Sequence, residues 1–308
     1  MTELARRELR RAAPARPSAL TVGVFDGVHL GHRHLFARLA ESARGRGLAA
    51  GAVTLDPDPV KVLHPERDLR YLTSLDERLD LLQGCGLDFV ALLTFTPELA
   101  SLTPADFARL LREELGMRLL LMGPDNAFGR DREGTPEVMA RAGRALSFDV
   151  EVVPPLLVDG RELHATDIRG ALARGDLAAA ERGLGRRYSV QGPVVKGDQR
   201  GRELGFPTAN IAVAPDRVLP AFGVYATWAY LGEARYPSAT SIGVRPQFAG
   251  LEPSVETFIL DFDGDIYGQT LKIELVERLS PEMKFETLDQ LKAKIADDVA
   301  RAREVLGR

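Results

Sequence analysis

The sequence predicts an α/β domain with a mostly parallel sheet, followed by a small antiparallel β-barrel and a C-terminal helix. Short apolar runs alternate with longer helical patterns from Ser18 to about Gly185, which is typical of a parallel sheet covered by helices. After Arg187 the chain is rich in β-branched and aromatic residues separated by turn signals, as in small barrels. The 308 residues are enough for two cores. We therefore expect domains at 1–185 and 186–308.

The elements of the first domain follow from its hydrophobic pattern. Apolar runs predict buried strands at 19–25, 48–55, 89–95 and 118–123. Amphipathic patterns predict helices at 33–47, 74–86 and 103–116. The last of these has Thr103 as a plausible N-cap and Pro104 at the first helical position.

The second domain is expected to contain short strands and one long helix. Runs of β-branched and aromatic residues predict strands at 188–195, 222–232, 235–243, 254–262 and 269–279, and the terminal helix is expected at 287–306. The segment "DFDGD" (261–265) is not a calcium loop, because Lys272 stands at the twelfth position where a glutamate is needed. We predict a hairpin turn there.

Composition excludes several classes of protein. A formal net charge of −4 gives no reason to expect a nucleic-acid partner, and no apolar run is long enough to span a membrane. Cys85 is the single cysteine, so there is no intramolecular disulfide, which fits a reducing cytoplasm. The first sixteen residues hold five arginines but neither the apolar core of a signal peptide nor the acidic-poor composition of a transit peptide. We expect a solvated tail or a short helix.

The segment "LTVGVFDGVHLGHRHLF" (20–36) holds three of the five histidines. It runs from strand to turn to helix, so its turn lies at the carboxyl end of a parallel strand, where open α/β sheets bind ligands. Its glycines allow close backbone approach, and a helix N-terminus favours phosphate. His29 and His32 can donate hydrogen bonds to a nucleotide's phosphates and stabilise charge during displacement at the α-phosphorus. A zinc site would need a further ligand, and His34 is assigned no role.

A second glycine-rich segment, "VVKGDQRGRELGFPTANI" (194–211), contains the other candidate site. Its loop can present backbone N–H groups to phosphate oxygens. Thr208 and Asn210 offer neutral oxygens two residues apart, a donor set suited to Mg²⁺, which binds few protein ligands together with phosphates and waters. The alternative is that the glycines are barrel corners and "PTAN" is an ordinary turn.

The chain resembles the prokaryotic bifunctional riboflavin kinase/FMN adenylyltransferases. "GVFDGVHLGH" is similar to the H-x-G-H motif of their nucleotidylyltransferase module, and further pieces of that module follow in order: "VTLDPDP" (53–59), "YLTSLDERLDLL" (71–82), "MGPDNAFGRDREG" (122–134) and "HATDIRGALARGDLAAAERGLGRRY" (164–188). This resemblance implies a Rossmann-like first domain that adenylylates FMN to FAD. It also implies that Thr166 and Arg169 support His29 and His32.

"GRELGFPTANI" resembles the riboflavin kinase signature. The resemblance implies that the barrel phosphorylates riboflavin to FMN, with Glu256 as general base for the ribityl hydroxyl and Mg²⁺ held by Thr208 and Asn210. We expect nucleotide or flavin contacts at Gly23, Phe25, Asp26, Gly27, Gly31 and Asp125 in the first domain, and at Gly197, Gly201, Gly205, Pro207, Thr208 and Asn210 in the second. The expected partners are ATP, riboflavin and FMN, with no nucleic acid and no membrane.

One departure from the family pattern bears on the balance of the two activities. Leu163, His164 and Ala165 occupy the positions of I-S-S, so two hydroxyl donors expected near the nucleotide phosphates are missing. We therefore expect adenylyl transfer to be slower than phosphorylation. Two alternatives stay open: a riboflavin kinase with a weak adenylyltransferase domain, and a flavin-binding or regulatory protein without turnover. The intact Thr208 and Glu256 argue against the second.

Overall fold

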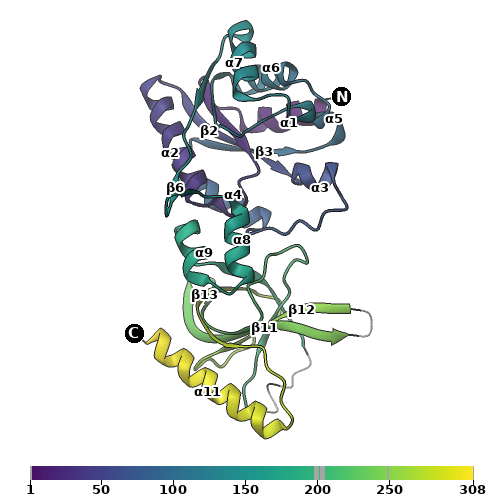
Figure 1. The fold of residues 1–308 in the computed structure, drawn as a ribbon, viewed down its shortest axis with the longest axis vertical. Helices are drawn as coiled ribbons and strands as arrows, with labels where there is room; N and C mark the ends of the chain where they lie inside the picture. The colour runs from purple at the N-terminus through teal and green to yellow at the C-terminus, as the bar shows by residue number, and fades with distance from the viewer. Residues whose placement is uncertain (1, 198–200, 202–204, 248–249, 308) are drawn as a thin grey trace. The chain divides into compact units, whose positions relative to one another are not determined.

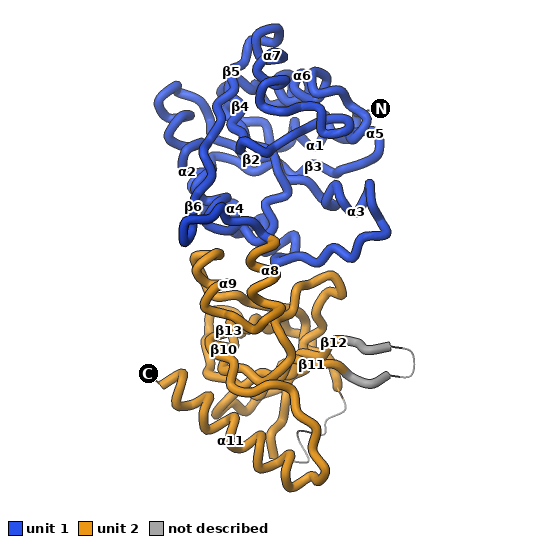
Figure 2. The backbone as a smooth tube through the Cα atoms, viewed as in Figure 1, with its two compact units in different colours: residues 1–165 blue, residues 166–308 orange. Residues whose placement is uncertain are grey.

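The structure is a computed structural model that describes residues 2–197, 201, 205–247 and 250–307. The chain forms two compact units, Met1–Ala165 and Thr166–Arg308 (Figure 2). No helix among the residues so described is long and apolar enough to cross a membrane.

The first unit is built on a five-stranded parallel sheet (Figure 1). Its elements are α1 (Glu3–Ala12), β1 (Ser18–Gly23), η1 (Asp26–Val28), α2 (Leu30–Gly45), β2 (Ala49–Asp56), α3 (Pro59–Leu63), α4 (Leu75–Gln83), β3 (Phe89–Thr94), α5 (Pro97–Ala100), α6 (Pro104–Leu115), β4 (Met117–Met122), η2 (Arg130–Arg132), α7 (Pro136–Leu146), β5 (Asp149–Val152), β6 (Leu157–Val158) and β7 (Arg161–Glu162). The strand order is β3-β2-β1-β4-β5. The topological switch point therefore lies between β1 and β4, beside the turn that follows β1.

Helices cover both faces of this sheet, as the near-continuous apolar strands predict. Along β4, Leu120 and Met122 point to one face, where they pack with residues of α1, α6 and α7. Leu119 and Leu121 alternate with them and pack on the other face, with Leu39 of α2. The period of two along a strand accounts for this division. The predicted parallel-sheet domain is confirmed.

The predicted helix start at residue 103 is also confirmed. Pro104 is the first helical residue of α6, and the Thr103 side chain accepts a hydrogen bond from the Asp106 backbone N–H. Ser74 starts α4 with a capping box, in which Ser74 and Glu77 each satisfy the other's backbone N–H. These caps satisfy N–H groups that a helix leaves unbonded at its first turn.

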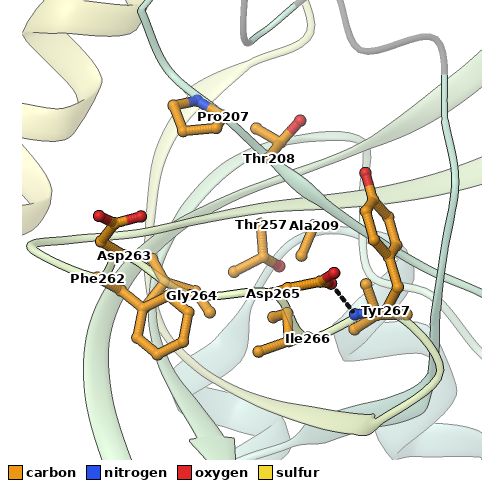
Figure 3. A pocket seen from close by; sticks show the side chains of 12 residues that line it. Pro207, Thr208, Ala209, Thr257, Phe262, Asp263, Gly264, Asp265, Ile266 and Tyr267 are labelled. Carbon is orange, nitrogen blue, oxygen red and sulfur yellow. Dashed lines mark hydrogen bonds between the residues drawn. The ribbon is translucent and has the colours of Figure 1, made fainter.

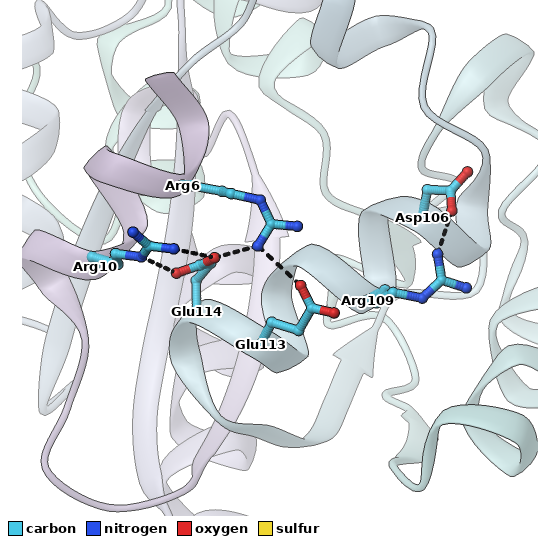
Figure 4. A network of polar contacts seen from close by, with 6 residues as sticks. All are labelled: Arg6, Arg10, Asp106, Arg109, Glu113 and Glu114. Atoms are coloured by element: carbon cyan, nitrogen blue, oxygen red, sulfur yellow. Dashed lines mark hydrogen bonds and ion pairs between the residues drawn. The ribbon is translucent and has the colours of Figure 1, made fainter. Parts of the chain in front are cut away.

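The arginine-rich N-terminal segment forms the helix α1, one of the two expected outcomes. It packs against the sheet through Leu9, which is fully buried. Figure 4 shows Arg6 and Arg10 converging on Glu114 of α6, with Arg6 also bonded to Glu113. The arginines hold the pKa of the Glu114 carboxyl below its usual value, chiefly through the Arg10 hydrogen bond. The ion pairs of Arg6 and Arg10 thus hold α1 against α6.

The second unit is a closed six-stranded barrel with a C-terminal helix. Its elements are α8 (Ala165–Ala173), α9 (Leu177–Leu184), β8 (Ser189–Val195), β9 (Ala209–Ile211), β10 (Gly223–Leu231), β11 (Ala234–Gln247), β12 (Gly250–Ile259), β13 (Thr270–Pro281) and α11 (Leu288–Leu306). The strand order around the barrel is β10-β11-β12-β9-β8-β13. Ala302 and Val299 of α11 pack on Ala226 of β10 and Ala239 of β11. The predicted barrel and terminal helix are confirmed.

The predicted hairpin turn at 261–265 is wrong. β12 and β13 are not neighbours in the barrel, because β12 pairs with β11 and β9 while β13 pairs with β10 and β8. The segment that joins them lines a cavity described below. Its glycine and aspartates suggested a tight turn, but strand pairing is set by the whole barrel and not by local turn chemistry.

Candidate functional site

The histidine-rich segment forms a tight turn between β1 and α2. His29 is the N-cap residue of α2, and its backbone carbonyl accepts a hydrogen bond from the Arg33 N–H. The rings of His29 and His32 stack, with centroids 3.7 Å apart and planes 25° apart. The structure thus brings together the two histidines that the sequence predicted to act as a pair. His34 lies within α2 and has no part in the stack.

Burial changes the protonation of His32. It lowers the pKa of His32 well below the ordinary histidine value, and the neighbouring His29 lowers it further. The Nδ1 atom of His32 is buried and makes no hydrogen bond to any described residue. His32 is therefore neutral at pH 7, and a neutral imidazole donates through one nitrogen only.

A loss of stability in acid follows from this lowered pKa. In the unfolded chain His32 binds a proton near its reference pKa of about 6.5, whereas the folded protein resists that proton to lower pH. The unfolded state thus binds more protons as pH falls below about 6.5, and the free energy of unfolding decreases there. We expect the melting temperature of the parent to fall relative to His32→Asn in calorimetric scans through this range. A constant difference between the two proteins would contradict the assigned shift.

Gly31 lies tightly against the stacked rings. A Cβ atom at this position would lie 3.0 Å from Cε1 and 3.1 Å from Nδ1 of the His29 ring, closer than ordinary van der Waals contact. The same Cβ would lie 3.5 Å from the backbone oxygen of Leu163. Leu163, the first residue of the segment in which the family pattern has two serines, therefore lies beside the histidine turn.

The remaining predicted residues of the first site lie in different environments. Gly23 ends β1, and Phe25, Asp26 and Gly27 belong to the turn itself, with Phe25 and Asp26 both 5 % exposed. Asp125 is exposed, in the loop after β4. Thr166 and Arg169 lie on α8, at the beginning of the second unit.

The second candidate site is built on two paired strands. Glu256 of β12 stands directly opposite Asn210 of β9 in the antiparallel register. Directly opposed residues share one face of a sheet, and so do residues two apart. Thr208 therefore joins them, and its Oγ1 lies 3.3 Å from Oε2 of Glu256. Asn210 is 7 % exposed. The three residues that the resemblance assigned to metal binding and base catalysis come together.

The glycine-rich loop packs directly on these residues. A Cβ atom at Gly197 would lie 2.3 Å from Nδ2 of Asn210, and one at Gly201 would lie 3.2 Å from Oγ1 of Thr208. Only glycine allows the loop to come this close without displacing the polar side chains. Gly205 and Pro207 follow in the same loop, whereas residues 198–200 and 202–204 lie outside the described part of the chain.

Two cavities meet at Thr208. The first, of about 350 Å³, is lined by Glu256, Phe206, Phe258 and apolar residues of α11, and its other charged groups are Glu282, Lys294 and Asp298. Lys294 Nζ lies 2.6 Å from Oδ1 of Asp298, which is 4 % exposed. A volume of this size is in the range of small-molecule sites.

The second cavity, of about 450 Å³, opens on the other side of Thr208 and is shown in Figure 3. Its wall includes Thr257 and the segment 262–267, in which Asp265 Oδ1 accepts a hydrogen bond from the Tyr267 N–H over 3.0 Å. Sequence reasoning missed this segment as a site. Its aspartates and aromatics were a signal, but they were interpreted only as a turn.

Within residues 2–197, 201, 205–247 and 250–307, no group of three or more His, Cys, Asp or Glu side chains is arranged to hold a metal ion.

Comparison with known proteins identifies both parts of the chain. The family profile for FAD synthetase matches residues 12–167, and that for riboflavin kinase matches residues 184–306. The bifunctional riboflavin kinase/FMN adenylyltransferase of Escherichia coli K12 is 38% identical over 96% of this chain and 95% of its own length. The protein of the same name from Bacillus subtilis is 31% identical over 92% and 91%.

A crystal structure extends the similarity over both units. A protein from Streptococcus pneumoniae, described as a macrolide-efflux protein, has a TM-score of 0.86 and 30% identity, with 96% of each chain covered. The agreement over nearly the full length shows that the combination of parallel-sheet unit and barrel unit occurs in a solved protein.

Proposed function

The chain belongs to the family of bifunctional riboflavin kinase/FMN adenylyltransferases, and we propose that it phosphorylates riboflavin at the Thr208–Asn210–Glu256 cluster and adenylylates FMN at the His29–His32 pair. Both activities follow from the family, whereas the assignment of residues is our proposal. One observation carries it: each predicted set of reacting side chains converges, the histidines at 3.7 Å between ring centroids and Thr208 and Glu256 at 3.3 Å.

Glu256 decides which cavity holds which substrate of the kinase. A general base must lie within hydrogen-bond reach of the proton it accepts. The cavity that Glu256 lines is therefore assigned to riboflavin, whose ring would pack on Phe206 and Phe258. The cavity on the other side of Thr208 is assigned to ATP. In this arrangement the ribityl hydroxyl oxygen attacks the γ-phosphorus, its proton passes to Glu256, and ADP leaves.

Thr208 and Asn210 fit a magnesium ion. Their neutral oxygens suit a hard cation that keeps several waters and binds phosphate oxygens, and Gly197, whose Cβ would lie 2.3 Å from Nδ2 of Asn210, lets the backbone come close to this donor. When bound, the ion would neutralise the charge of the transferring phosphoryl group. The protein's part is to hold ATP in line with the hydroxyl and to exclude water from the riboflavin cavity.

At the histidine turn the FMN phosphate oxygen attacks the α-phosphorus of ATP and pyrophosphate leaves. No covalent enzyme intermediate is needed. The N-terminus of α2 favours the negative phosphates, and the stacked imidazoles donate hydrogen bonds to oxygens on which charge develops. Because His32 is neutral, it serves as a donor and not as a fixed positive charge. Thr166 and Arg169 are assigned to the same reaction from the family motif alone.

We further propose that the adenylyltransferase domain covers residues 1–185 and the kinase domain residues 186–308, since the kinase profile begins at residue 184. The compact units divide earlier, at Ala165 and Thr166. With substrates such as ATP and a single cysteine, we assign the protein to the cytoplasm.

Gly197→Ala is expected to impair the kinase selectively. The added Cβ would overlap the Asn210 amide, so either the loop or Asn210 must move, and a displacement of about 1 Å at a catalytic group costs about 10²-fold in rate. FMN formation from riboflavin and FAD formation from supplied FMN are measured separately by chromatography, and only the first should fall. The control is Gly170→Ala in α8, where a Cβ meets only the flexible end of Arg174. Equal kinase rates in both variants would argue against Asn210 as a magnesium ligand.

A further inference from the structure

The carboxylate of Asp26 is held inside the first unit by a neighbouring segment. It accepts hydrogen bonds from the Leu72 N–H over 3.0 Å, from the Thr73 N–H over 3.1 Å and from the Thr73 hydroxyl over 3.1 Å. The Thr73 Oγ1 in turn accepts a hydrogen bond from the Gly27 N–H over 3.0 Å. Asp26 and Thr73 are 5 % and 6 % exposed. These contacts tie the histidine turn to the segment that precedes α4.

The turn needs such restraint because its backbone is unusual. Phe25 has φ 56° and Val28 has φ 39°, and both are non-glycine residues in the left-handed region. This region is unfavourable for residues with a Cβ, above all for a β-branched one such as Val28. Conformations of this kind persist only where the surroundings over-determine them, and they cluster at functional sites.

The geometry points to a positioning role for this pair of side chains. We propose that Asp26 and Thr73 hold the turn in the conformation that places His29, the residue directly after Val28, at the N-terminus of α2. Their polar atoms are turned inward to each other and to the backbone, so they act through His29 and not by contact with the substrate. This inference rests on the proposed role of His29 and His32 in adenylyl transfer.

Thr73→Val tests the proposal, because valine keeps the shape of threonine and removes only the hydroxyl. The Gly27 N–H and the Asp26 carboxylate then each lose a partner. We expect kcat for FAD formation to fall by about 10²-fold while the KM for ATP stays near its parental value. The ring signals of His29 and His32, observed by NMR in histidine-labelled protein, should shift. FMN formation at the barrel should be unchanged. Asp26→Asn is expected to behave in the same way.

Two variants separate positioning from general stability. Thr73→Ser keeps the hydroxyl and should retain adenylyl transfer. Ser74→Ala removes the adjacent N-cap of α4, in which the Glu77 N–H donates to Ser74 Oγ over 3.2 Å; it should lower the melting temperature but keep kcat and the histidine signals.

The proposal is overturned if Thr73→Val forms FAD at the parental rate. It is also overturned if Thr73→Ser or Ser74→Ala loses as much activity as Thr73→Val, since the effect would then come from general destabilisation. His29→Ala in the same assay tests the underlying role of the histidine separately: if that variant keeps its activity, the proposed function of the turn fails, whatever Thr73 does.

Discussion

Glu256→Gln is expected to lower the rate of FMN formation by about 10²- to 10⁴-fold, the usual contribution of a general base. Glutamine keeps the size of the side chain and can still bond to Thr208, but it cannot accept the ribityl proton. Riboflavin and ATP should therefore still bind to the variant. FAD formation from supplied FMN should continue at the parental rate, because we assign it to the histidine turn. Both products are measured by chromatography over time.

The matched control is Glu277→Gln. Glu277 is an exposed glutamate of β13 in the same barrel, so this variant has the same change of charge without a change at the cluster. It should keep full kinase activity. Should Glu256→Gln phosphorylate riboflavin as fast as Glu277→Gln, Glu256 is not the base, and the assignment of the 350 Å³ cavity to riboflavin loses its basis.

His29→Ala is expected to have the opposite selectivity. It removes a donor that acts mainly in the transition state, and losing such a donor costs about 10²- to 10³-fold in kcat. It also removes the ring on which His32 stacks, so the geometry of both donors is lost together. FAD formation from FMN and ATP should fall accordingly, with FMN formation from riboflavin unchanged. Product ratios under saturating ATP give the result directly.

His34→Ala serves as the control for this experiment. His34 lies two residues after His32 in α2 and has no part in the stack. Its removal should leave both activities intact. Similar losses of FAD formation in the two variants would mean that α2 is sensitive to any truncation, and the stacked pair would then have no special role.

Local signals were sufficient to predict the layers of the fold. The strand at 118–123 was visible as an apolar run, and its alternate residues serve opposite faces of the sheet. Thr103 and Pro104 marked a helix start because capping depends on only a few neighbouring residues. The arginine-rich segment was ambiguous, since its helix is fixed by Glu114, which lies more than 100 residues away in the chain.

The candidate site was predictable only where its residues are close in sequence. His29 and His32 are three residues apart in one short turn, which is why the sequence suggested them as a pair, although the helix was predicted only from residue 33 and α2 begins at Leu30. Thr208 and Asn210 share a strand face for the same kind of reason. The pairing of Glu256 with Asn210 depends on barrel register, and sequence spacing alone does not give it; the family resemblance only assigned both residues to one site.

Two features escaped prediction because they need long-range contacts. Thr73 bonds to Asp26 across 47 positions of sequence, and nothing local distinguishes it from an ordinary residue before a helix. The segment 261–265 was predicted as a hairpin turn, although β12 and β13 are not neighbours in the barrel and residues 262–267 line a cavity. In both cases the function of the residues follows from what the fold places beside them.

The central claim is that one chain holds two independent sites, and mixing two disabled proteins tests it most directly. Glu256→Gln and His29→Ala are each incubated with riboflavin, ATP and Mg²⁺, separately and then together, and FMN and FAD are separated by chromatography. Alone, the first should form neither product and the second should stop at FMN. Together they should form FAD, because FMN released by the His29→Ala protein is adenylylated by the Glu256→Gln protein. A mixture that forms no more FAD than either protein alone would contradict the account.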